Sequence, residues 1–451
     1  MGAYIFQTLI DFTNMYFVGR MGSADYIGGF GLGIMWTNVA CLSFLIGMTS
    51  ALETLCSQAF GKRDFKLLGS IHNKAQMIML VVAIPLSFFM YYCDNILIVL
   101  GMQKELALLA AQFTRIYIPS CFIMGEFETT KKYLQTQQIF YPPLVINVVT
   151  ALLHPLWCIL FMNVFTNKLS AIAYAKNFTN LLSYTSLLLY ITLSKCCKES
   201  WTFPKKESFK DWGPFIKLAV YGAAFTCLEW WACEIINIFA GYIESTSLAA
   251  SIAISNLNIL YCMIPFGIGM TATTLIGNSL GELSSFNAKT YAKAAGIINA
   301  IIVFIMGALM IIFSKGIASF FTEDREVASI IIKILPLLAL EEMFDTTQTI
   351  LGKVIIGMGK QEMSSKIALV VYYAIMLPLA YIMGLKLKLG AFGLWEAMAI
   401  GMAILTVCYF MVIYRSDWEK LVQEVIEYLE IIQKKSKIDN ECSQESIKDI
   451  N

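Results

Sequence analysis

The sequence predicts an all-α integral membrane protein with twelve transmembrane helices in two six-helix lobes related by an internal repeat. Three observations predict this class. Hydrophobic residues make up 58% of the 451 residues and charged residues 14%, and the mean hydropathy is +0.66, far above that of soluble proteins. Apolar runs of roughly 20 residues, each long enough to cross about 30 Å of hydrocarbon, recur along the chain. Motifs of the first half return in the second half.

The apolar runs, separated by polar segments, place the spans in chain order. They are residues 3–18, 26–52, 68–92, 107–127, 139–162, 170–194, 213–241, 247–275, 292–314, 327–352, 364–384 and 390–414. The first run is followed by GRMGSAD and not by a small-residue cleavage site, so we expect a span there and no cleaved leader.

The distribution of Lys and Arg over the loops predicts that both termini are cytoplasmic. With the amino terminus inside, the inner loops carry more of these residues than the outer loops. Lys131, Lys132 and Lys353 count among the inner residues and Lys176 among the outer ones. The orientation follows from this difference.

An internal duplication of six spans is indicated by two recurring motifs. GMTSALETLCSQAFG at Gly47 returns as GMTATTLIGNSLG at Gly269, and YIPSCFIMGEFETT at Tyr117 returns as KILPLLALEEMFDTT at Lys333. Each repeat holds an even number of spans, so an axis along the membrane normal relates them and the substrate site belongs between or within the lobes. The predicted parts are an N-lobe at 1–194, a cytoplasmic linker at 195–212, a C-lobe at 213–414 and a tail at 415–451.

The tail is predicted to form an amphipathic cytoplasmic helix that packs on the inner face of the protein. Its apolar residues recur at helical spacing: Trp418, Leu421, Val422, Val425, Ile426, Leu429 and Ile432. Acidic residues outnumber basic ones in the tail, which argues against a polybasic lipid anchor.

Composition also excludes several functions. The net charge of +1 gives no reason to expect a nucleic-acid partner. The twelve cysteines show no CxxC spacing, so we expect them to pack as small apolar residues. His72 and His154 are the only histidines, which argues against a histidine-built metal site. A membrane-embedded enzyme would need a His-rich, Ser/His or paired-Asp constellation at one depth, and the sequence offers none.

Carboxylates inside the spans are the candidate functional groups. Each costs roughly 2.5 to 3.5 kcal/mol to insert, so such residues usually face the bundle interior and mark an ion or substrate path. Burial favours the protonated form, which suits exchange of a proton for a cation. The candidates are Glu53; Glu126 and Glu128; Glu229 and Glu234; and Glu341, Glu342 and Asp345.

The seventh span, FTCLEWWACEIINIFAG, carries two of these carboxylates. Glu229 and Glu234 are five residues apart, hence about 140° apart around a helix, so one narrow stripe does not hold both. Glu229 lies deeper and is the predicted coupling residue, with a structural hydrogen bond as the alternative. Glu234 lies nearer the outer end and is a predicted substrate contact. Trp230 is either a π face for an organic cation or a packing residue.

The tenth span presents Asp345 on a polar stripe with Glu341, Gln348 and Thr349. We predict a coupling role for Asp345 and a substrate contact for Gln348; helix capping or interhelical hydrogen bonding is the alternative. Glu126 and Glu128 precede Lys131 and Lys132 closely, so pairing with these lysines at the cytoplasmic rim is expected instead. Glu53 is a further predicted substrate contact.

At these residues the chain resembles the eukaryotic multidrug and toxic compound extrusion (MATE) transporters. ALETLCSQAFG, CLEWWACE, IGNSLGE and FDTTQTILGKVIIGMGKQ look like family motifs, and the likeness runs from about Val18 to Val412. The resemblance implies a V-shaped fold of two lobes with twelve spans. It also implies exchange of protons for organic cations or, in plants, for flavonoids, citrate and alkaloids.

The resemblance also implies roles for particular residues. The glutamate of CLEWW and the acid of the tenth-span motif, which take part in proton coupling and substrate binding in the family, fall on Glu229 and Asp345. The second glutamate of the seventh span falls on Glu234. The chain departs from the family at Asn256, a predicted substrate contact where mammalian members have a glutamate, and at Asn14, where prokaryotic members have an aspartate.

These residues predict a proton-coupled antiporter that exports organic cations, xenobiotics or secondary metabolites by alternating access. We expect a monomer in the plasma membrane or a vacuolar or other endomembrane, without a cofactor other than the proton gradient. The alternatives are a lipid-linked oligosaccharide flippase and an organic-anion exporter. A flippase needs cationic residues in its cavity, whereas the charges inside the spans are almost all acidic.

Overall fold

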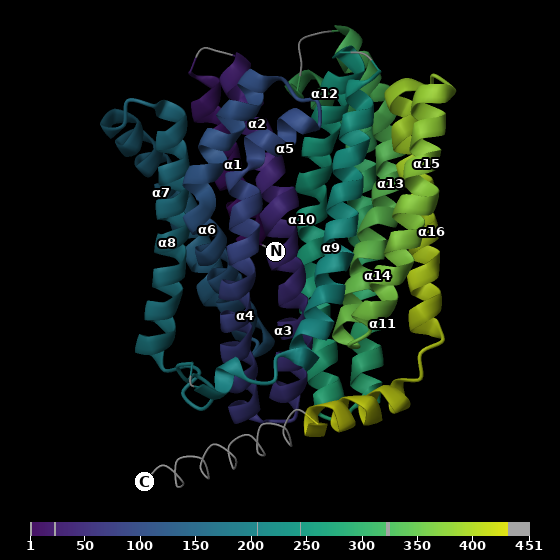
Figure 1. The fold of residues 1–451 in the computed structure, drawn as a ribbon. Coiled ribbons are helices and arrows are strands. Elements are labelled where there is room, and N and C mark those ends of the chain that lie inside the picture. The colour runs from purple at the N-terminus through teal and green to yellow at the C-terminus, as the bar shows by residue number, and fades with distance from the viewer. Residues whose placement is uncertain (1, 22–23, 205, 244, 322–324, 432–451) are drawn as a thin grey trace. The chain divides into compact units, whose positions relative to one another are not determined.

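A computed structural model of the chain describes residues 2–21, 24–204, 206–243, 245–321 and 325–431, and its regular elements in these ranges are all helices (Figure 1). Each of the predicted ranges coincides with helix except for one or two residues at some boundaries. Among the described residues, 8 helical stretches are long and apolar enough to cross a membrane. The predicted all-α class is therefore confirmed.

The first half of the chain holds the helices up to α8. They are α1 (Gly2–Gly19), α2 (Ala24–Thr37), which continues through the π-helix η1 (Asn38–Leu42) into α3 (Ser43–Gly61), α4 (Phe65–Tyr91), α5 (Cys93–Val99), α6 (Lys104–Thr136), α7 (Tyr141–Val164) and α8 (Lys168–Ser194). A short 3₁₀ helix, η2 (Lys206–Phe209), lies in the linker that follows.

The second half repeats this order of elements. It holds α9 (Gly213–Gly241), α10 (Ser245–Gly281), α11 (Ser285–Ile312), α12 (Ser314–Phe321), α13 (Arg325–Gly357), α14 (Gln361–Leu369), η3 (Val370–Met376), α15 (Leu377–Ala380), η4 (Tyr381–Lys386) and α16 (Gly390–Tyr414). The short α12 follows α11 as the short α5 follows α4, and α6 and α13 each have 33 residues. This correspondence agrees with the motif repeat in the sequence.

The chain forms two compact units whose boundary lies inside α9: Gly2–Ala223 with the chain from Val425 on, and Ala224–Glu424. In the first unit, α6 packs against α2, α3, α4, α5 and α8. In the second unit, α13 packs against α10, α11, α12 and α16. The central helices, α6 and α13, are thus the ones that carry the repeated motifs MGEFETT and LEEMFDTT.

The end of α6 differs from the prediction. The predicted span stopped at residue 127, but the helix continues to Thr136 and buries Lys131 and Lys132 completely. Lys131 pairs with Glu128, as expected, whereas Lys132 pairs with Glu53. These acids and lysines therefore lie inside the unit and not at a solvated rim.

Two other lysines of the loop count also lie on helices. Lys353 is buried in α13, and Lys176 of α8 pairs with Asp11. Counting them as loop charges was wrong, because α13 continues past the predicted end at residue 352 and Lys176 lies within α8 itself. The predicted orientation depends on the remaining loop residues.

The linker after α8 packs onto α4 and α6. Ser200 Oγ lies 2.6 Å from the Tyr133 hydroxyl and donates to Gln137 Oε1 at 2.9 Å. Asn73 donates to Thr202 Oγ1 at 3.0 Å. The first part of the linker is therefore an ordered part of this unit and not a free connection.

Gly69 of α4 permits this contact, which gives a first prediction. A Cβ atom at this position would lie 2.1 Å from the Ser200 carbonyl oxygen, so Gly69→Val must displace the linker. We expect a lower melting temperature in detergent, followed by tryptophan fluorescence. The control is Gly31→Val in α2, where a Cβ would meet nothing within 4 Å. Equal melting temperatures for the two variants would show that the linker contact contributes nothing.

The tail forms the predicted amphipathic helix over residues 418–431. Its apolar face is buried at Trp418, Leu421, Val422, Val425 and Leu429. The Tyr428 hydroxyl donates to the Pro214 carbonyl at 3.0 Å. The predicted packing of this helix on the protein is confirmed, while Ile432 and the chain beyond it lie outside the described residues.

Candidate functional site

The structure joins Glu229 and Asp345 through one amide group. Gln348 Nε2 donates to Glu229 Oε1 at 2.8 Å and to Asp345 Oδ1 at 2.9 Å. The two carboxylates are therefore no further apart than two hydrogen-bond lengths. Both predicted coupling residues, on spans far apart in the sequence, belong to one site.

Helix geometry explains this arrangement. Asp345 and Gln348 are three residues apart on α13, so they share one face of that helix. Glu229 lies in the part of α9 that belongs to the same compact unit. On the other side of Asp345, the Cys262 thiol of α10 donates to its Oδ2 at 3.3 Å. Three helices thus contribute to the surroundings of one aspartate.

The electrostatics of the pair favour binding of a positive charge. Asp345 and Gln348 are almost fully buried, so water screens the carboxylates weakly. Two negative charges at this separation repel each other strongly unless a proton or a cation lies with them. The Gln348 amide supplies donors but no net charge. The site can therefore hold either a proton or a cation, and each relieves the same repulsion.

Two further acids of α13 lie beside this pair. Glu341 and Glu342 are both 0% exposed, and neither oxygen of Glu341 has a hydrogen-bond partner among the described residues. The Cys262 thiol lies 3.7 Å from Glu342 Oε2. The buried acidic group is thus larger than the predicted pair.

The other predicted substrate contacts are not joined to this site by any hydrogen bond or ion pair of the described residues. Glu234 is half-buried and accepts a hydrogen bond from Asn237 on its own helix at 3.5 Å. Trp230 is half-buried on α9. Asn256 lies on α10, but its side chain is outside the described part of the structure. Their roles stay predictions.

Glu53, a further predicted substrate contact, is held in a buried ion pair. It lies in the other compact unit, where its ion pair with Lys132 neutralises its charge, and both side chains are 2% exposed. A carboxylate held this way already has its cation. A direct substrate contact by Glu53 therefore requires Lys132 to leave.

Cys262 and Lys353 are neighbours of the site that sequence reasoning missed. Lys353 lies one and a half turns after Gln348 on α13, and its Nζ is 4.8 Å from the Phe266 ring centroid. The repeat could have identified Lys353, because Lys132 occupies the same place near the end of α6. Nothing in the sequence separates Cys262 from the other cysteines of the spans.

The first unit contains a separate polar group around His154. Its Nε2 lies 2.8 Å from Asn14 Oδ1 and its Nδ1 lies 2.7 Å from Thr179 Oγ1. Asn14, where the prokaryotic aspartate is replaced, is thus a fully buried hydrogen-bonding residue. Asp11, one turn earlier, is paired with Lys176. The acid beside this polar group, Asp11, thus has a basic partner.

Gln348 gives a prediction for this site. Gln348→Leu keeps the bulk but removes the amide that both carboxylates share, and a hydrogen bond to a charged group contributes about 1.5–3 kcal/mol. We expect roughly tenfold or greater loss in the initial rate of substrate uptake at low substrate concentration. Met343→Leu, on the exposed side of the same helix, is the control. Unchanged uptake by Gln348→Leu would mean that the bridge has no functional role.

Comparison with known proteins connects this site to a family. The chain matches the model of the MatE family over residues 1–160 and again over 223–382, so the two matches start at the spacing of the repeat. It is 28% identical over 430 residues to Protein DETOXIFICATION 16 of Arabidopsis thaliana, covering 94% of this chain and 88% of that protein.

Two further relatives agree with this match. Multidrug and toxin extrusion protein 1 of Danio rerio is 27% identical over 418 residues, which cover 93% of this chain and 71% of that protein. The crystal structure of the eukaryotic MATE transporter AtDTX14 superposes with a TM-score of 0.89 and 25% identity, covering 95% of each chain.

Proposed function

Since the chain belongs to the MatE family of multi-pass membrane transporters, we propose that it is a proton-coupled antiporter that exports organic cations, xenobiotics or secondary metabolites across the plasma membrane or an endomembrane. The observation that carries this proposal is the Gln348 amide shared by Glu229 and Asp345. The buried carboxylate of Asp345 and the half-buried carboxylate of Glu229, bridged by one amide, form a site that a proton and an organic cation compete for.

Competition at this site couples the two fluxes. A substrate cation binds when the pair is deprotonated, and protonation from the acidic side displaces the substrate because the site no longer attracts a second positive charge. Exchange requires that each side of the membrane reach the same carboxylates in turn. No cofactor other than the proton gradient takes part in this scheme.

We further propose that the chain spans the membrane twelve times, in two six-helix lobes that move against each other during alternating access. The repeated order of helices in the two halves supports this arrangement. Each half also has an even number of expected spans, as in transporters built from parallel repeats.

The charge of the site supports cations over anions as substrates. Glu229, Glu341, Glu342 and Asp345 form the acidic group, and the charge of Lys353 acts on Glu229 from the same helix as Asp345. An oligosaccharide flippase or an organic-anion exporter would need an excess of positive charge to receive a pyrophosphate or carboxylate. The excess here is negative.

Uptake by proteoliposomes tests this function. The full chain is reconstituted with an acidic interior, and accumulation of a radiolabelled quaternary ammonium ion is measured. This ion keeps its charge at every pH, so trapping of a protonated weak base does not imitate transport. Electroneutral exchange under a gradient of about 1 pH unit supports about tenfold accumulation, since each unit is worth about 1.4 kcal/mol.

The direction of the gradient supplies the control. A protonophore or an acidic exterior is expected to abolish the accumulation. Accumulation that ignores the gradient would contradict proton coupling. Transport of a labelled organic anion but of no cation would replace this proposal by an anion exporter.

A further inference from the structure

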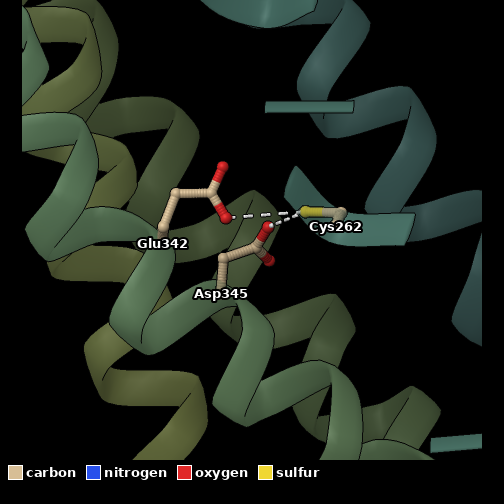
Figure 2. A group of neighbouring side chains, drawn as sticks. All are labelled: Cys262, Glu342 and Asp345. Carbon is tan, nitrogen blue, oxygen red and sulfur yellow. Dashed lines mark hydrogen bonds between the residues drawn. The ribbon is translucent and has the colours of Figure 1, made fainter. Parts of the chain in front are cut away.

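Three side chains from two helices form a compact group beside the proposed coupling site (Figure 2). They are Cys262 of α10 and Glu342 and Asp345 of α13. Cys262 Sγ lies 3.3 Å from Asp345 Oδ2 and 3.7 Å from Glu342 Oε2. All three of these atoms lie within 4.8 Å of one another. Figure 2 shows both carboxyl groups directed toward the sulfur atom.

These separations match those of a transition-metal site. In a tetrahedral zinc site, Zn–S is about 2.3 Å and Zn–O about 2.0–2.2 Å, so a sulfur and an oxygen ligand lie about 3.6 Å apart. The two sulfur–oxygen distances here lie on either side of this value. A metal ion in place of the thiol proton would therefore suit both sulfur–oxygen distances.

A second observation points to a missing positive charge at this place. Glu341, one turn before Asp345, is 0% exposed and has no hydrogen-bond partner on either oxygen. Glu342 Oε1 and Gln348 Oε1 are likewise buried without a partner among the described residues. Buried polar groups normally have partners, so these unpartnered oxygen acceptors on α13 favour a cation among the acids of this helix.

The donor types select the class of ion. A thiolate is a soft ligand that favours Zn²⁺ and related ions, whereas Mg²⁺ and Ca²⁺ prefer oxygen ligands alone. Three protein ligands leave a fourth position open, as in zinc sites that keep a water or substrate ligand. Cys262 itself is half-buried.

We propose that Cys262, Glu342 and Asp345 bind a divalent transition-metal ion of the Zn²⁺ class, and that the bound ion blocks antiport by occupying Asp345. The binding claim stands on the geometry of the three ligands. The inhibition claim rests on the proposed function, because it requires Asp345 to take part in transport. Two separate readouts therefore test the two claims.

Cadmium titration tests binding without any transport measurement. Cd²⁺ bound to a thiolate gives an ultraviolet charge-transfer absorption, which is followed in the purified full chain in detergent. Cys196 is exposed and its Sγ lies 3.6 Å from Cys197 Sγ, so this pair is a competing thiol site. Burial raises the pKa of the Cys197 thiol to about 12, so Cys197 is a poor source of thiolate and Cys196 is the member of the pair to remove. All titrations therefore use a Cys196→Ser background.

In this background, Cys262→Ser is expected to lose the high-affinity part of the absorption, with at least tenfold weaker Cd²⁺ binding. Cys408→Ser, a half-buried cysteine of α16, is the matched control and should leave the titration unchanged. Glu342→Gln keeps every thiol but removes an oxygen ligand, so it should also weaken binding about tenfold. Identical titrations for Cys262→Ser, Glu342→Gln and the control would overturn the metal site.

Zinc inhibition tests the second claim. In proteoliposomes, Zn²⁺ is expected to inhibit uptake of the quaternary ammonium ion by the Cys196→Ser background, and Cys262→Ser should need at least tenfold more Zn²⁺ for the same inhibition. Equal inhibition of both would overturn the inhibition claim and leave the binding claim to the titration. If no variant transports a cation, the proposed function fails. The Cd²⁺ titration then still decides whether Cys262, Glu342 and Asp345 bind a metal ion.

Discussion

Glu229→Gln is expected to abolish proton-driven accumulation of an organic cation while the protein stays folded. Glutamine has nearly the same shape, and its carbonyl oxygen can still accept the hydrogen bond from the Gln348 amide. It carries neither a titratable proton nor a negative charge. Loss of a charged partner in such a site costs about 2–5 kcal/mol, so we expect uptake to fall by roughly 30-fold or more.

The control is Glu396→Gln, which makes the same change in α16 of the same compact unit. It should accumulate the cation as the unchanged chain does. Accumulation that survives Glu229→Gln would make Glu229 a structural hydrogen-bond acceptor and would move the coupling role to Asp345.

The largest expected effect on stability comes from Lys132→Met. Lys132 and Glu53 form an ion pair in which both side chains are 2% exposed. Removal of one partner leaves a buried charge without compensation, which typically costs about 3–5 kcal/mol. We expect a strongly reduced melting temperature in detergent and poor yield of folded protein.

A second substitution separates charge from packing. The double change Glu53→Gln with Lys132→Met removes both charges and should recover much of the lost stability. The exposed pair of Lys366 and Glu362, at 2.7 Å, is the control, because Lys366→Met should cost no more than about 1 kcal/mol. Equal losses at Lys132 and Lys366 would contradict the burial argument.

Helix positions were predictable from the sequence because each span must satisfy its backbone hydrogen bonds within a continuous apolar run. Every expected range therefore falls on helix, except for one or two residues at some boundaries, and the repeat appears again in the order of the elements. The ends of α6 and α13 were not predictable from hydropathy. Lys132 and Lys353 make these ends look like loops, yet the folded unit buries both residues.

The members of the site were predictable only one at a time. The cost of a carboxylate in hydrocarbon identified Glu229 and Asp345, but nothing in the spacing of the sequence showed that they meet. The structure joins them because the long side chain of Gln348 reaches both. Cys262 was missed, since a contact between helices depends on their rotation about their axes, and an almost uniformly apolar helix such as α10 does not reveal this rotation.

The most direct test of competition at the shared carboxylates is a count of protons released when substrate binds. A quaternary ammonium ion is added to the purified chain in weakly buffered detergent solution, and a pH-sensitive dye records the release. Competition between proton and cation at these carboxylates predicts proton release that saturates together with binding and is lost in Glu229→Gln. Saturable binding of the cation without any proton release, at every pH tested, would contradict it.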